Sequence, residues 1–322
     1  MLFHDLHDRS AALFVASGQA RRNARRAHKL HNLLHSASLM LAMALIVAFC
    51  GLAVGGQDFA VAALAIAPLA ALVSPTIAPS ILLRLHGARP LRSYEAPALH
   101  DAMRTLSNRA GLSHTPCLCY APGAHLNAYS IGTRKRAAVV LTDGLLRCLS
   151  PRELAGVLAH EVSHIANNDV RLMNIADVMS RTASLLSYFG MALLLLNLPS
   201  IMIEQVMAPW LLVGTLSLAP VVLALLQLAL SRTREFDADL DAVALTRDPD
   251  GLISALAKLE RLQGGNWERL GFPRRGVSLL RTHPRTEERI RRLRDLRAPA
   301  PDADIRGYVI VTPLGLRLVR AA

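Results

Sequence analysis

The sequence predicts a mainly α-helical membrane protein with a smaller α+β domain, in which four transmembrane helices form two hairpins. Three observations lead to this prediction. The 322-residue chain contains four long apolar runs without charge, which is typical of membrane helices. A strongly capped helix begins at Ser150, and short strand-like segments precede it. The helix and the segments indicate that a folded domain lies between the two pairs of apolar runs.

The apolar runs are long enough to cross a bilayer, because about 20 residues of helix span a hydrocarbon core of ~30 Å. Within each pair the connection is very short, which predicts hairpins. A signal peptide is the alternative for the first run, but the run is too long and a second follows at once. An apolar hairpin folded onto the soluble domain is the alternative for the second pair. The four runs are residues 33–56, 59–83, 182–203 and 205–231.

The charge distribution predicts how the hairpins are oriented. The chain carries a formal net charge of +12 while 52% of its residues are hydrophobic, a combination that favours a membrane protein with basic loops over a nucleic-acid-binding protein. Arginines precede the first hairpin and follow it, whereas the link at residues 55–58 has none. We therefore expect both termini and the folded domain on the cytoplasmic side. Four cysteines without metal-binding spacing indicate reduced thiols.

The helix that begins at Ser150 has an unusually complete start signal. Ser150 is a suitable N-cap, Pro151 occupies the first helical position, and Glu153 completes a capping box. Apolar residues then recur at helical spacing, so the helix should pack into a core. We expect it to continue to about Arg181.

This helix contains the motif His160-Glu161-x-x-His164. Residues four apart lie on one helical face, so both imidazoles can bind one tetrahedral metal ion. Glu161 projects beside them, where it can take a proton from a water molecule. The alternative, two unrelated histidines beside a carboxylate, does not explain why the motif lies within a properly capped helix. The motif predicts a metal site with a catalytic base.

A catalytic zinc ion generally has three protein ligands, so a third must come from elsewhere in the chain. The segment 231–242 places Glu235 and Asp239 four residues apart on one helical face. Glu235 is the better candidate for the ligand. One of the two carboxylates can bind the metal while the other supports a ligand histidine.

The segments before the HExxH helix predict a small sheet. An amphipathic helix at residues 96–110 is followed by strand-like segments at 117–120, 127–130 and 137–142, the last two joined by a turn at 133–136. A small sheet beside an HExxH helix is the arrangement of zincin-type proteases. In these enzymes the substrate pairs with the edge strand as an added β-strand.

Four sequence features together resemble the HtpX-type membrane metalloproteases, zinc endopeptidases related to the CAAX prenyl endopeptidases. The resemblance extends from about Leu33 to Leu296. It rests on HEVSHIANND, on SRTREFDADLDA, on Thr282-His283-Pro284 and on Asn127-Ala128. The two longer motifs are highly specific in combination.

The resemblance implies a role for each matching residue. It implies one zinc ion bound by His160, His164 and Glu235, with Glu161 as the catalytic base. Asp239 matches an acidic residue one turn beyond the third ligand. In the same way His283 is expected to line the cleft and donate a hydrogen bond to the oxyanion, and Asn127 to lie at the substrate-binding edge strand.

The predicted function is zinc-dependent hydrolysis of peptide bonds in damaged or misfolded membrane proteins, as the resemblance implies, on the cytosolic side of the cell membrane. The expected partners are membrane proteins or unfolded polypeptides, and the lipid bilayer. Two alternatives are a site-specific processing protease of the CAAX-endopeptidase type and a non-proteolytic membrane adaptor with a structural zinc. No cysteine lies near either long motif, which disfavours a structural site.

This prediction divides the chain into six parts. These are a basic N-terminal tail (1–29), hairpin 1 (30–85), the first part of the catalytic domain (86–181), hairpin 2 (182–231), the second part of the catalytic domain (232–297), and a linker with a C-terminal tail (298–322).

Overall fold

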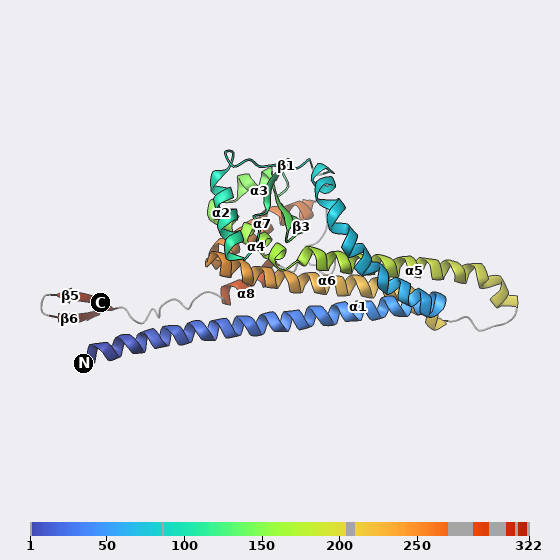
Figure 1. Cartoon of the computed structure of the whole chain (residues 1–322), viewed down its shortest axis with the longest axis horizontal. Coiled ribbons are helices and arrows are strands. Elements are labelled where there is room, and N and C mark those ends of the chain that lie inside the picture. Colours follow the sequence, from blue (N-terminus) through green and yellow to red (C-terminus); the bar gives the residue numbers. More distant parts are fainter. Residues whose placement is uncertain are drawn as a thin grey trace.

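The computed structural model is mainly helical, with one small mixed sheet and a separate two-stranded hairpin (Figure 1). It describes residues 2–85, 87–203, 210–269, 286–295, 307–312 and 315–320.

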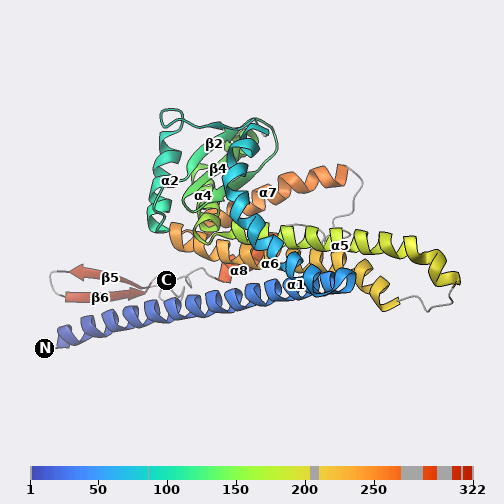
Figure 2. The same cartoon turned by 45° about the vertical axis from the view of Figure 1, so that its right-hand side comes forward.

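Three long helices pack alongside one another and form the elongated part of the molecule (Figures 1 and 2). They are α1 (Leu2–Leu85), α5 (Asp169–Ile203) and α6 (Trp210–Thr246). Small and flexible apolar side chains such as Met43, Ala176 and Leu223 fill the space between them. The outward faces of the three helices are apolar and exposed. Such faces are suited to contact with lipid rather than water.

The three helices contain the candidate membrane spans of the described part of the chain. By length and composition these are Lys29–Ile66, Asp169–Ser200 and Leu212–Thr246, so three are found there rather than the four expected. The first span continues through a break in α1, where Gly56 adopts a φ of 76° that favours glycine. The break falls at the predicted link between two apolar runs, and the chain then runs back toward the sheet (Figures 1 and 2).

A four-stranded sheet lies beside these helices and has the strand order β1-β2-β4-β3. Strand β4 pairs in parallel with β2 and antiparallel with β3, and β3 is therefore an edge strand. Two short helices, α2 (Pro97–Arg109) and α3 (Asp143–Cys148), accompany the sheet. The strand segments predicted from alternation agree with the observed strands to within a few residues. The strands are β1 (Arg89–Pro90), β2 (Cys117–Ala121), β3 (Ala128–Thr133) and β4 (Arg136–Thr142).

Helix α4 (Pro151–Ala166) is the HExxH helix, and it lies at the centre of the main hydrophobic core. It contacts α2, α6, α7 (Pro249–Arg269), β3 and β4. Helix α7 begins with Pro249 in its first turn. Because neighbouring elements surround α4, its two histidines are held on a rigid support.

The prediction that the HExxH helix continues to about Arg181 is wrong. Helix α4 ends at Ala166, and α5 begins at Asp169. Between them Asn168 adopts a left-handed conformation with a φ of 57°, which asparagine tolerates better than most residues. The break turns the chain so that Asp169 faces back toward His164.

Among the described residues that follow α7 there are one helix and one two-stranded hairpin. Helix α8 (Thr286–Asp295) is rich in arginine and contacts α6 and α7. Strands β5 (Gly307–Thr312) and β6 (Gly315–Arg320) form an antiparallel hairpin within the predicted C-terminal tail.

The N-terminus of α4 is held by a network centred on the buried carboxylate of Glu153. Its Oε2 accepts hydrogen bonds from the Ser150 amide at 2.8 Å and from Lys258 Nζ at 2.9 Å. Its Oε1 accepts one from Ser254 Oγ at 2.6 Å. The predicted capping box is therefore present, and two residues of α7 are bound to it. Burial alone would raise the pKa of Glu153, but the hydrogen bonds from Ser254, Ser150 and Lys258 lower it to about 2.

Replacing this carboxylate should destabilise the fold in a pH-dependent manner. A lowered carboxyl pKa stabilises the folded state above the unfolded value of 4.5, and this contribution is lost as the pH falls toward 2. We expect Glu153→Gln to lower stability at pH 7 by about 1.5–3 kcal/mol, the usual contribution of a hydrogen bond to a charged group. The deficit should shrink at pH 3. Thermal unfolding at both pH values measures it, with the exposed Asp101→Asn as control. A deficit that does not change with pH would contradict the prediction.

Candidate metal centre

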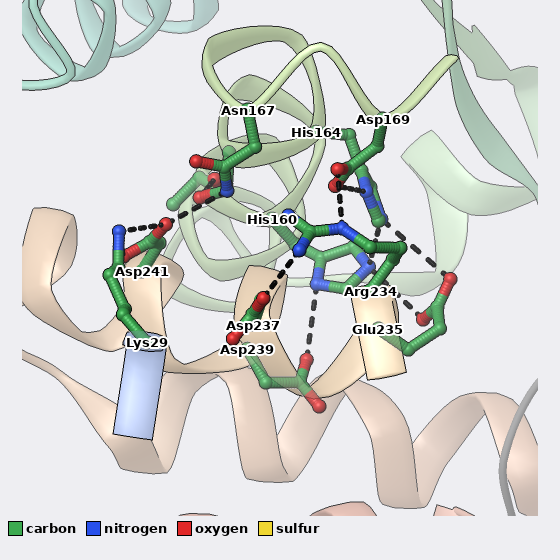
Figure 3. A network of polar contacts seen from close by, with 12 residues as sticks. Lys29, His160, His164, Asn167, Asp169, Arg234, Glu235, Asp237, Asp239 and Asp241 are labelled. Carbon is green, nitrogen blue, oxygen red and sulfur yellow. Dashed lines mark hydrogen bonds and ion pairs between the residues drawn. The ribbon is translucent and has the colours of Figure 1, made fainter. Parts of the chain in front are cut away.

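Side chains from α4 and α6 converge on one point in the structure. The Nε2 atoms of His160 and His164 lie 3.1 Å apart. Glu235 Oε2 lies 3.4 Å from Nε2 of His160, and its Oε1 lies 3.7 Å from Nε2 of His164. These three residues form the group within the described part of the chain that could hold a metal ion (Figure 3).

The spacing of these atoms can be compared with what a metal ion requires. Two ligand atoms bound at 2.0–2.1 Å to one tetrahedral ion lie about 3.3–3.4 Å apart. The observed separations of 3.1, 3.4 and 3.7 Å fall around that value. Two imidazoles and a carboxylate are also a donor set that suits a divalent ion such as zinc. The residues therefore fit a metal site with three protein ligands.

A carboxylate holds the outer nitrogen of each histidine. Asp239 Oδ1 lies 3.1 Å from Nδ1 of His160, and Asp169 Oδ2 lies 2.8 Å from Nδ1 of His164. A proton on each Nδ1 leaves the lone pair on Nε2, which points toward the shared position. Both rings are thus fixed in the orientation and tautomer that metal binding needs.

The electrostatics of the site favour a positive charge between the histidines. Burial lowers the pKa of His160, but hydrogen bonds with the carboxylates of Asp239 and Glu235 outweigh this effect and raise it to about 10. The buried Glu161 adds a further carboxylate to the same cleft. The carboxylates that favour this positive charge would also favour a divalent cation, whose binding would displace the second proton of the His160 ring.

Arg289 on α8 is a part of the site that the sequence analysis did not identify. Its guanidinium is buried, donates to both oxygens of Asp239 at 2.7 and 2.8 Å, and lies 3.1 Å from Glu235 Oε2. It therefore fixes the two carboxylates of α6 relative to one another. The sequence holds one signal for it: Arg289 lies four residues before the apolar Leu293, so in a helix both occupy the same face.

A cleft with a volume of about 410 Å³ opens over the histidines and Glu161. Its other walls include residues of α7, α8 and the edge strand β3, and Asn127 is also part of its lining. The backbone of Asn127 is fixed by Thr142, whose Oγ1 accepts from the Asn127 amide at 3.0 Å. An edge strand beside such a cleft is a place where an extended peptide can pair.

The structure brings most of the predicted site residues together. Glu161, His160, His164 and Glu235 line the same cleft with Asn127, while Asp239 stands behind His160. The predicted role of His283 lies outside the described residues. Asp237, two residues after Glu235, faces a different direction and binds Arg234 (Figure 3).

The fold and the site agree with what comparison with known proteins shows. Residues 93–297 match the model of peptidase family M48, and this match covers more than half of the chain. The chain belongs to peptidase family M48. It is a multi-pass membrane member of that family, since the described residues include three helices long and apolar enough to cross a membrane beside a protease domain.

Its relatives carry the name Protease HtpX homolog. One from Salinibacter ruber is 34% identical over 284 residues, which cover 82% of this chain and 98% of the relative. One from Bifidobacterium longum is 38% identical over 230 residues, or 64% of this chain and 72% of the relative. The crystal structure of Ste24p from S. mikatae is 21% identical with a TM-score of 0.44. That comparison covers 83% of this chain and 66% of the other, just under two thirds.

If Glu235 is the third ligand, its removal should reduce metal binding. Removing a residue that only hydrogen-bonds to a metal ligand typically weakens metal binding ~10–100-fold. We expect Glu235→Ala to weaken zinc binding by more than this. The matched control is Asp177→Ala, which removes an exposed carboxylate of α5 that pairs with Arg181. Zinc content after equilibration with a metal buffer measures the effect. Equal zinc in the two variants would mean that another group supplies the ligand.

Proposed function

We propose that the chain is a zinc-dependent endopeptidase that hydrolyses peptide bonds of damaged or misfolded membrane proteins on the cytosolic side of the cell membrane. The observation that carries this proposal is the convergence of His160, His164 and Glu235 beside the buried Glu161, in a cleft bounded by an edge strand. The family and its relatives support proteolysis. The proposal adds the metal, the side of the membrane and the class of substrate.

In this proposal each protein group has a separate task. A zinc ion held by the three ligands would polarise the scissile carbonyl and make the attacking water more acidic. Glu161 takes a proton from that water and later returns it to the leaving nitrogen. Strand β3 aligns the substrate backbone. Asp239 and Asp169 keep the ligand histidines in place, and His283 is proposed as a donor to the oxyanion.

The proposed membrane arrangement extends what the helices support. We propose four spans in two hairpins, with residues 1–29 and 298–322 as cytoplasmic tails and the two parts of the catalytic domain on the same side. The break at Gly55–Gly56 and the return of α1 toward the sheet support the first hairpin (Figure 2). The arginines that flank both apolar pairs support the orientation.

Two alternatives remain to be separated by experiment. A site-specific processing protease of the CAAX type would cut one defined segment, and such enzymes generally carry more spans. An adaptor with a structural zinc would need a closed site, usually of four ligands. The open cleft over the three residues argues against the adaptor.

Cleavage of casein by the purified protein tests the enzymatic proposal. Activity should disappear with a chelator and return with zinc. The variant Glu161→Gln should keep its zinc but lose ~10²–10⁴-fold in turnover, because the base is absent while the shape is retained. A Glu161→Gln protein with more than a tenth of wild-type turnover would exclude this base. Casein cleavage that is insensitive to chelation would exclude the metal mechanism.

The geometry also predicts where substrates are cut. Helix α6 continues without interruption from the apolar run to Glu235, which lies four residues beyond Ser231. At 1.5 Å per residue this is about 6 Å, so the cleft should open near the membrane surface. Cutting should therefore fall as a cleavable segment is moved away from a substrate's last span by a rigid spacer. A rate that is independent of the spacer would show that the helices serve only as an anchor.

A further inference from the structure

Helix α6 directs polar residues to two different sides. Glu235 lines the cleft and Asp239, four residues further on, lies behind His160, whereas Arg234, Asp237 and Asp241 lie on another face (Figure 3). The second group contacts α1 and the start of α5. These residues are buried but do not belong to the set that would touch metal or substrate.

Arg234 connects this second face to the metal centre. Its Nε donates to Asp169 Oδ1 at 2.6 Å, and its Nη1 donates to Asp237 Oδ2 at 2.6 Å. The other oxygen of Asp169 holds Nδ1 of His164 at 2.8 Å. All four side chains are at most 14% exposed. The carboxylate that orients a proposed ligand is thus itself oriented by a guanidinium, whose planar geometry fixes direction as well as charge (Figure 3).

Helix α1, which contains the first candidate membrane span, also contacts these residues. Asn32 Nδ2 donates to Asp237 Oδ1, the oxygen that Arg234 does not occupy. Three residues earlier on the same helix, Lys29 Nζ pairs with Asp241 at 2.8 Å. Both α1 residues lie at the beginning of the candidate span Lys29–Ile66. The polar contacts therefore occur where the first membrane helix meets the catalytic part of the chain.

The contact between Lys29 and Asp241 reaches the HExxH helix by a different route. Asp241 Oδ2 accepts from Asn167 Nδ2 at 2.9 Å, and Asn167 is the C-cap residue of α4. The end of α4 and the beginning of α5 are consequently held by α6 and α1 together. Their positions determine where Asp169 stands relative to His164.

A cavity of about 780 Å³ lies beside these contacts, between α1, α5 and α6. Its wall includes Lys29, Asn167, Arg234 and Asp237. Next to this space, hydrogen bonds from Asn32 and Lys29 join α1 to α6. Without a donor from Asn32, one oxygen of the buried Asp237 would lose its partner, and Arg234 would be free to shift from Asp169 toward Asp237.

We propose that Asn32 is a positioning residue for the metal centre, and that the first membrane helix is in this way part of the support of His164. The inference rests on the proposed zinc peptidase function. The path runs from Asn32 through Asp237, Arg234 and Asp169 to His164, and every step is a contact between polar atoms.

The test compares full-length variants in detergent. Asn32→Ala removes the donor, and Asn32→Asp places two carboxylates against each other. In the double variant Asn32→Asp with Asp237→Asn the pair is exchanged: the new amide donates to residue 32 and its oxygen still accepts from Arg234. His31→Ala is the control, because His31 is the exposed neighbour in the same helix. The measurements are zinc affinity by chelator competition, kcat and KM for casein peptides, and Tm.

Losing a residue that hydrogen-bonds directly to a metal ligand lowers metal affinity ~10–100-fold. The loss of zinc affinity in Asn32→Ala should be smaller, because Asn32 acts on His164 through other side chains. We expect zinc affinity and kcat to fall ~3–10-fold with KM unchanged, a greater loss in Asn32→Asp, and recovery in the exchanged pair. His31→Ala should match the wild type.

Two results would overturn the proposal. The first is equal zinc affinity and kcat in Asn32→Ala and His31→Ala. The second is a lowered Tm with unchanged zinc affinity and kcat, because Asn32 would then stabilise the fold without positioning the metal centre. Failure of the proposed function is distinguishable: a wild-type protein that binds zinc but cleaves no peptide refutes the peptidase, while the zinc affinities of the variants still decide the role of Asn32.

Discussion

The arrangement of His160 and His164 depends on what holds the far side of each ring. Two neighbouring imidazoles on a helix can rotate independently, and nothing in a helix alone makes both Nε2 atoms point to one place. Here Asp239 and Asp169 occupy the opposite nitrogens, and the Nε2 atoms face each other at 3.1 Å. Those two carboxylates come from different long helices, so the geometry of the site depends on how α5 and α6 are placed against α4.

Much of the remaining structure serves that placement. The capping network around Glu153 fixes the beginning of α4 to α7, and the left-handed Asn168 ends α4 at the point where Asp169 can turn back. Arg289 and Arg234 then hold the carboxylates of α6 and α5 from two sides. Buried charges of this kind are stable only when each has a partner, which explains why arginines and carboxylates alternate around the centre.

Local sequence patterns predicted the elements better than the contacts between them. The capping box, the HExxH spacing and the shared face of Glu235 and Asp239 are short-range features, and all of them are present in the structure. The break after Ala166 was missed because apolar periodicity continues across it, although two adjacent asparagines were a signal. The contacts of Asn32 and Arg289 join residues far apart in the chain. No pattern of spacing within one helix reveals such contacts, whose partners are set by tertiary packing.

The continuity of α6 also limits how this chain can vary in length. A residue inserted between Ser231 and Glu235 would rotate everything beyond it by 100° relative to the apolar part of the helix and advance it by 1.5 Å. Either the packing against α1 and α5 or the direction of Glu235 would then be lost. Insertions are tolerated in most proteins where loops separate an anchor from an active site. In this protein no loop separates them, so the spacing between lipid-facing residues and Glu235 is as constrained as the residues themselves.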